Sequence, residues 1–514
     1  MSVFEFHMEK FMGVLGCGKT TLLNILSHRI EGRIGGDILL NGQPLNKKRF
    51  NDLCEFVDME VRLMPHLTIQ ELLIYHARLS LNCKQEAIGH RTAALMQQFD
   101  LVTLKHEKVG QLHESALRRL ILVLHLVRDP VLIVIDEPVR DLDSLSAYQF
   151  MTSLQNHVRK HARMAIVSMR CPRSDIYQLL NQITLLFYGE VMYSGTTKQM
   201  PHYFSQLGYR CPIHENPAVY YLSLATVDRE TPESYAESRT NAMKLVDHFR
   251  KNLENCEFPV SNTTNEAPIL SCYFGAPTNT RRLGTLINRN GFLLFNSMAF
   301  FLSHLMLPFV ILFVAIFGVN FTSTGLHIPQ SAAGMIFLLI FMTGLIAVTS
   351  TCISFMELSP TMFWEVAQGL YNASYMLLAY LLISSIFDIV SILMSSAAFI
   401  WLTTFDLQLD IVLKLALVLF CTHMFYKLIT LSIFVFIGDS YHVAIVGTLL
   451  CCISATVCSS FIKSYSSFLS INLYYPTYLS IERYANVILL AELMNFADGI
   501  MEANTFIQIS YHHL

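Results

Sequence analysis

Charged residues are scarce in this sequence. They make up 15% of its 514 residues, whereas hydrophobic residues make up 53%; soluble domains commonly contain roughly 25% charged residues. The net charge of −3 also lacks the basic excess by which proteins bind nucleic acid through its phosphates. The composition therefore excludes a single soluble domain, a disordered chain and a basic nucleic-acid-binding protein.

Two other patterns are missing. The 12 cysteines contain no C-x-x-C spacing, so we interpret them as free thiols rather than as a disulfide framework. Residues 1–10 contain no apolar stretch of the kind found in a cleavable signal peptide. Targeting to a membrane would therefore have to come from internal apolar segments.

The few charges are concentrated in the first part of the chain. Residues 290–514 contain four Lys/Arg and ten Asp/Glu, and subtraction from the totals of 36 and 39 leaves 32 basic and 29 acidic residues before them. Five apolar stretches there are long enough for a helix that crosses a bilayer, which needs about 20 residues. They run over 297–319, 331–353, 375–402, 410–437 and 441–463. We predict a globular domain followed by an all-α transmembrane helix bundle of about five spans.

An amphipathic helix is predicted just before the first span. In 281–296, three arginines (Arg281, Arg282 and Arg289) alternate with apolar residues. This pattern is typical of a helix that lies at the cytoplasmic interface of a membrane, and the arginines fit the positive-inside rule.

Three ionisable residues fall inside the predicted spans. Asp388 lies near the middle of the third span, and His423 and Lys427 share one face of the fourth at i, i+4 spacing. Ionisable residues at this depth are functional candidates. A structural pair between helices explains them as well, and so does a Lys427 side chain that extends to the interface.

A phosphate-binding loop is predicted near the start of the chain. Gly13 to Thr20 reads GVLGCGKT and fits G-x-x-x-x-G-K-[ST], and the next residues read as a helix whose N-terminus faces the anion. The glycines let backbone N–H groups surround phosphates, Lys19 neutralises phosphate charge, and the Thr20 hydroxyl coordinates Mg²⁺. The predicted ATP-binding residues are Gly13, Gly16, Cys17, Gly18, Lys19, Thr20 and Thr21.

A second motif supports this interpretation. The apolar run 131–135 reads as a buried parallel strand, and Asp136 and Glu137 follow it directly. Asp136 is placed to share Mg²⁺ with Thr20, and Glu137 to act as the catalytic residue that polarises the attacking water. The alternative is a helix start and a core strand that ends in acidic residues by chance.

The order of these motifs resembles an ATP-binding cassette (ABC) protein. A cassette placed before the membrane half resembles the G subfamily of half transporters, the White and sterolin group, and within it the sterolin-2-type sterol transporters. The segments that carry this likeness are 171–177 (CPRSDIY), 208–212 (GYRCP), 216–228 and 365–371 (EVAQGLY). The resemblance implies an α/β P-loop cassette in the cytosol, a multi-pass protein of the plasma membrane, and ATP-driven export of sterol or other lipid by a dimer.

The sequence departs from the family at several positions. The signature loop, which would complete the partner's ATP site, falls on 112–116, where Glu114 replaces a glycine. Arg170 stands at the switch histidine, Met59 at the Q-loop glutamine and Asp141 at the D-loop glycine. Because this chain should not complete its partner's site, we expect a heterodimer with a second half transporter rather than a homodimer.

The resemblance also sets the expected domain limits. We predict a short nucleotide-binding domain at 1–228, a linker at 229–280, the interfacial helix at 281–296, the transmembrane domain at 297–463 and an extracellular segment at 464–514. A β-subdomain well before the P-loop and a sixth span, both expected in the family, are not found, and only twelve residues precede Gly13. We therefore expect a truncated or degenerate member.

Two functions are compatible with the sequence. The first is a half transporter that binds ATP and Mg²⁺ at its own P-loop and exports sterol or other lipid with slow hydrolysis. The second is a catalytically degenerate membrane subunit that stabilises or regulates an active partner.

Overall fold

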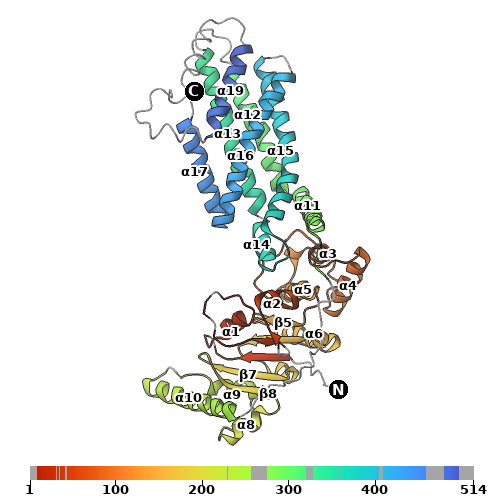
Figure 1. Cartoon of the computed structure of the whole chain (residues 1–514), viewed down its shortest axis with the longest axis vertical. Helices are drawn as coiled ribbons and strands as arrows, with labels where there is room; N and C mark the ends of the chain where they lie inside the picture. The colour runs from red at the N-terminus through yellow and green to blue at the C-terminus, as the bar shows by residue number, and fades with distance from the viewer. Residues whose placement is uncertain are drawn as a thin grey trace. The chain divides into compact units, whose positions relative to one another are not determined.

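The structure is a computed structural model. It describes residues 8–14, 16–30, 32–33, 35–40, 43–228, 230–255, 275–319, 328–356, 358–404, 409–458 and 480–496. The chain divides into two compact units (Figure 1). The first contains Met1–Arg282 and Ala367–Leu370, and the second contains Leu283–Val366 and Tyr371–Leu514.

A six-stranded mixed sheet forms the centre of the first unit. Its order is β4-β5-β6-β1-β7-β8, in which the neighbouring pairs are parallel except for the antiparallel pair β7–β8. The strands are β1 (Met8–Met12), β4 (Cys54–Val57), β5 (Leu132–Ile135), β6 (Met164–Met169), β7 (Gln182–Phe187) and β8 (Glu190–Thr196). All four residues of β5 are buried, as expected for a central parallel strand. A separate hairpin pairs β2 (Leu39–Leu40) with β3 (Gln43–Pro44).

Helices lie between the strands of the first unit and after the last of them. They are α1 (Lys19–Leu26), α2 (Lys47–Leu53), α3 (Ile69–Ser80), α4 (Gln85–Gln98), α5 (Glu114–Leu126), α6 (Ser144–His161), α7 (Ser174–Leu179), α8 (Met200–Gln206) and α9 (Pro217–Leu224), with a 3-10 turn at Val109–Gln111. Local sequence fixes several helix starts. The Thr68 hydroxyl accepts a hydrogen bond from the Glu71 N–H, and the Glu71 carboxylate accepts one from the Thr68 N–H, which is a capping box.

The predicted linker contains a helix. Helix α10 (Pro232–Asn255) occupies its first part and buries Ala242, Leu245, Val246 and Phe249. The ring centroid of Phe249 lies 6.5 Å from that of Tyr193 on β8. Although the segment is rich in polar residues, apolar residues on one face give the helix a side to bury. The first part of the predicted linker 229–280 is therefore a helix with a buried face, and 256–274 lies outside the described residues.

The second unit is entirely helical in its described part. It contains most of α11 (Asn279–Asn296), followed by α12 (Met298–Val319), α13 (Ile328–Met356), α14 (Ser359–Ala367), α15 (Ala373–Thr404), α16 (Leu409–Ile437), α17 (Ser440–Cys458) and α19 (Ile481–Phe496). Helix α11 covers the predicted interfacial helix, whose location at a membrane surface stays a prediction. The α/β first unit and the helical second unit confirm the predicted fold class.

Four described helices are long and apolar enough to cross a membrane. They cover Met298–Ile316, Gly334–Met356, Ala373–Leu402 and Leu409–Ile437, and correspond to the first four predicted spans. The fifth predicted span coincides with α17, whose apolar part, Ser440–Thr456, is shorter. The total of five spans stays a prediction, and most of 464–514 lies outside the described residues.

Small residues bring the helices of the second unit close together. A Cβ atom on Gly344 of α13 would lie 2.8 Å from the ring of Tyr426 on α16. A Cβ atom on Gly447 of α17 would lie 2.8 Å from Val348 Cγ1 on α13. Both distances are shorter than a carbon–carbon contact allows, so glycine is what permits these approaches.

A buried ion pair fastens α11 to α14. Arg289 Nη1 and Nη2 donate to Glu365 Oε1 and Oε2 at 2.5 and 2.9 Å, and the Tyr371 hydroxyl also donates to Glu365. Arg289 and Glu365 are both almost fully buried. Burial lowers the pKa of Arg289, but the charge of Glu365 outweighs it and raises that pKa overall. The first and last residues of the EVAQGLY segment thus share one structural role.

Candidate functional site

The predicted phosphate-binding loop lies between β1 and α1. Gly16 and Gly18 have φ values of +79° and +102°, which glycine adopts without strain. A Cβ atom on Gly13 would lie only 2.3 Å from Cys17 Sγ, so a side chain does not fit there. The buried Lys19 ammonium donates to the carbonyl oxygens of Gly13, at 2.7 Å, and Val14, at 3.0 Å.

Asp136 and Glu137 directly follow the buried strand β5. The Ser168 hydroxyl, at the end of the adjacent strand β6, donates to the Asp136 carboxylate and accepts from the Glu137 N–H at 3.0 Å. The register pairs Ile135 with Val167, which places Ser168 next to the two acidic residues. Ser168 was not predicted from the sequence, because its role depends on the register of two strands far apart in the chain.

A cavity of about 510 Å³ brings these residues together. Its walls include Gly16, Gly18, Lys19, Thr20, Thr21, Asp136 and Glu137. Gly13 and Cys17 do not line it; Cys17 is buried beneath the loop. The start of α1, with its free N–H groups, adds to the charge of Lys19, so the cavity suits an anion such as a phosphate group.

The cavity also suits a magnesium ion held together with a phosphate. The Thr20 hydroxyl and the Asp136 carboxylate both line it, and both are hard oxygen donors. No cluster of three or more His, Cys, Asp or Glu residues arranged for a metal was found within the described residues. In nucleotide sites Mg²⁺ commonly uses one or two protein oxygens plus phosphate and water.

Two of the departures from the family pattern lie at this site, and a third lies at the start of α5. Met59 and Arg170 line the cavity. Glu114 is the first residue of α5, and its carboxylate accepts a hydrogen bond from Arg118 Nε at 2.8 Å. The negative charge at the signature position is therefore neutralised by the chain's own Arg118, which sequence reasoning missed.

Arg170 contacts the predicted catalytic residue. Its Nε donates to Glu137 Oε1 at 2.9 Å. This hydrogen bond, together with the charge of Glu137, raises the pKa of the Arg170 guanidinium. The residue at the switch position is thus a permanent cation that is bonded to a carboxylate.

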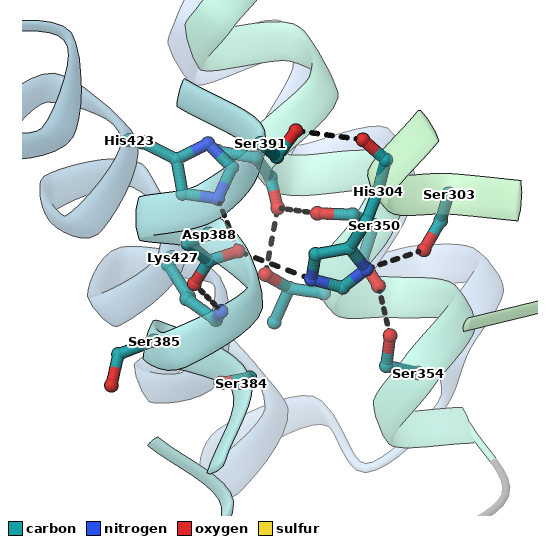
Figure 2. A network of polar contacts seen from close by, with 12 residues as sticks. Ser303, His304, Ser350, Ser354, Ser384, Ser385, Asp388, Ser391, His423 and Lys427 are labelled. Atoms are coloured by element: carbon teal, nitrogen blue, oxygen red, sulfur yellow. Dashed lines mark hydrogen bonds and ion pairs between the residues drawn. The ribbon is translucent and has the colours of Figure 1, made fainter. Parts of the chain in front are cut away.

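Asp388 in the second unit is the centre of a buried polar cluster (Figure 2). His423 Nε2 from α16 and His304 Nε2 from α12 each lie 3.1 Å from Asp388 Oδ1, and Lys427 Nζ donates to Oδ2. Ser391 on α15 also donates to the backbone oxygen of His304 at 2.8 Å. The three predicted polar residues do meet, and His304 adds a third helix that the sequence did not indicate.

Comparisons with known proteins agree with this geometry. The family model described as "ABC transporter" matches residues 1–140. The chain is 28% identical over 416 residues to mouse "ATP-binding cassette sub-family G member 5", covering 76% of this chain and 62% of that protein. It is 29% identical over 260 residues to human "ATP-binding cassette sub-family G member 8", covering 49% of this chain and 38% of that protein.

A third relative is Drosophila "Protein white", which is 31% identical over 250 residues that cover 46% of this chain and 36% of that protein. The chain therefore spans about three fifths of the length of the first of these relatives, where the match covers 62% of that protein.

Proposed function

Because this chain is a distant relative of the G-subfamily ABC half transporters, we propose that it binds ATP and Mg²⁺ at its P-loop and exports lipid as one half of a dimer. The observation that carries the proposal is the cavity lined by Lys19, Thr20, Asp136 and Glu137 at the start of α1. These residue types at one helix N-terminus suit nucleotide phosphates.

Each of these residues has a distinct role in the proposal. Lys19 and the N–H groups of the loop neutralise the phosphate charge, and Thr20 and Asp136 hold Mg²⁺. The metal ion, when bound, offsets the charge that develops on the transferred phosphoryl group. Glu137 orients and polarises the attacking water.

The proposed dimer is asymmetric. The signature position of this chain carries Glu114, tied to Arg118, where the family has a small, uncharged residue. This position would not accept the phosphates of a nucleotide held by the partner, because a glutamate side chain stands where a glycine would let backbone N–H groups approach them. A second half transporter with an intact signature loop would complete this chain's own site.

The proposed cargo is a sterol or another lipid. The resemblance to sterolin-2-type transporters favours a sterol. The four membrane-length helices favour an apolar molecule in general, since they are apolar over most of their length. We place the protein in the plasma membrane on the same resemblance.

A second candidate function is a degenerate subunit that binds ATP but does not hydrolyse it. The ion pair between Arg170 and Glu137 favours it, as does Met59, whose thioether is a poor partner for water or Mg²⁺. In this case the chain would stabilise or regulate an active partner.

The test uses the full chain co-expressed with a G-subfamily half transporter that has an intact signature loop. We expect Lys19-dependent ATP binding: Lys19→Met should weaken it at least tenfold, since a charged hydrogen bond contributes about 1.5–3 kcal/mol. The exposed Lys47, replaced by Met, is the matched control. Equal ATP binding by the wild type and Lys19→Met would refute the proposal.

The same complex separates the two candidate functions. Vanadate-sensitive ATP turnover that Glu137→Gln abolishes supports an active site in this chain. ATP binding with turnover that Glu137→Gln leaves unchanged supports the degenerate subunit.

A further inference from the structure

Glu137 is held by neighbours at each of its polar groups. Its N–H donates to Ser168 Oγ at 3.0 Å, its carbonyl oxygen lies 3.5 Å from Arg118 Nη1, and its carboxylate accepts from Arg170 Nε at 2.9 Å. Its φ is +41°, which is uncommon for a residue with a side chain. The position of this residue is therefore set by contacts from α5 and β6 rather than by its own backbone preference.

Arg170 reaches Glu137 because of the sheet. Strand β6 runs parallel to β5 and ends at Met169, so the next residue leaves the sheet on the side where Asp136 and Glu137 emerge from β5. The side chain of Arg170 is 44% exposed and that of Glu137 is 21% exposed, so both can reach a bound molecule. The cavity is lined by both residues.

The other cations that line the cavity have partners of their own. Lys19 donates to backbone oxygens of the loop, Arg118 binds Glu114, and Arg140 lies 3.3 Å from Glu60 and 3.4 Å from Asp141. The guanidinium of Arg29 lies over the ring of Phe56, 4.2 Å from its centroid. Among the cations that line the cavity, Arg170 is therefore the one that binds the Glu137 carboxylate.

We propose that Arg170 is a positioning residue that restrains Glu137, so that this site retains nucleotide and hydrolyses it slowly. The inference rests on the proposed function and adds to it how the site is regulated. Where a neutral imidazole would leave the carboxylate free, the guanidinium occupies one of its oxygens.

The chemistry explains the direction of the effect. In hydrolysis, the water oxygen forms a bond to the γ-phosphorus, the bond from that phosphorus to the ADP oxygen breaks, and a water proton passes to Glu137. Protonation of Glu137 removes the negative charge that Arg170 faces, so the ion pair stabilises the state before the transfer more than the state after it. The barrier to hydrolysis rises accordingly.

The test isolates this one site. The full chain is co-expressed with the partner half transporter described above, in which the partner's own P-loop lysine is replaced by Met. ATP affinity and the single-turnover rate of phosphate release are measured separately for wild type, Arg170→His, Arg170→Ala and Arg170→Lys. Arg173→Ala serves as the control, since Arg173 is exposed, follows Arg170 by three residues and pairs with Asp175.

We expect Arg170→His and Arg170→Ala to raise the single-turnover rate of phosphate release about tenfold. This is less than the full contribution of a general base, because the Arg170–Glu137 pair is partly exposed to water. ATP affinity should change less than about threefold. Arg170→Lys, which keeps the charge, should gain less than Arg170→Ala. Adding Glu137→Gln to Arg170→His should remove the gain.

Unchanged or lower rates in Arg170→His and Arg170→Ala, with ATP affinity preserved, overturn this inference and leave the proposed function standing. An equal gain in Arg170→Lys and Arg170→Ala also overturns it, because the restraint would then not depend on charge. Failure of the wild type to bind ATP in a Lys19-dependent manner overturns the proposed function, and this inference with it.

Discussion

Replacing Asp388 with Asn tests whether the polar cluster of the second unit acts as one coupled group. Asp388 is 1% exposed and is contacted by Lys427 and His423 from α16 and by His304 from α12. The substitution keeps the size of the side chain but removes its charge. Lys427, which is also 1% exposed, would then lose its carboxylate partner.

The lost hydrogen bonds and the unpaired charge predict different magnitudes for this change. Hydrogen bonds between membrane helices average about 0.6 kcal/mol, so losing the two from His423 and Lys427 would cost roughly 1 kcal/mol. Removing one partner of a buried ion pair costs about 3–5 kcal/mol, because an uncompensated charge remains. Since Lys427 is buried and faces Asp388 directly, we expect the larger value, about 3 kcal/mol for Asp388→Asn.

The double variant Asp388→Asn with Lys427→Met removes both charges. We expect it to cost about 1 kcal/mol, less than Asp388→Asn alone, because no buried charge is then unpaired. The measurement is a double-mutant cycle of unfolding free energies in mixed detergent micelles. Asp410→Asn is the control: Asp410 pairs with Lys414 on the same helix α16, but both are exposed, so its cost should stay below about 0.5 kcal/mol. If the unfolding free energies lost in Asp388→Asn and Lys427→Met simply add in the double variant, the two residues are not coupled and the prediction is refuted.

Two further predictions concern buried carboxylates. Burial raises the pKa of Glu55, but the hydrogen bond with His125 and the charge of Arg128 outweigh it and lower that pKa overall. The Glu55 carboxylate therefore stabilises the fold fully above its unfolded pKa of about 4.3, and this contribution is lost as pH falls through its folded pKa. Glu55→Gln should flatten the acid side of a stability–pH profile measured by thermal unfolding. Arg289→Lys cannot reproduce the two hydrogen bonds to Glu365 and should lower stability by about 1–3 kcal/mol in denaturant unfolding; no change would contradict the role given to this pair.

The sequence was informative where a short segment determines local structure. The glycines and Lys19 of the P-loop, and the apolar run before Asp136, predict a loop and a strand whose geometry depends on neighbours in the chain. The same holds for the four membrane-length helices, because hydropathy over about 20 residues is a local property.

Local sequence patterns could not predict contacts between segments that are far apart in the chain. Ser168 contacts Asp136 because of a strand register, and His304 lies 84 positions before the Asp388 that it contacts. The Arg170–Glu137 pair could be suspected only from an unusual residue at one family position. Helix α10 was missed for a different reason, since its polar composition hides four buried side chains on one face.

The close packing of α13 determines which parts of the second unit can move. In its most apolar window, 61% of α13 is buried, compared with 33% for α12, 44% for α15 and 39% for α16. Gly344 and Gly447 bring α16 and α17 into van der Waals contact with α13, so turning α13 about its axis would drive its side chains into both neighbours. We therefore expect α13 to move least of the four membrane-length helices and α12, the least buried of them, to move most. The amide hydrogens of α13 should then exchange more slowly than those of α12.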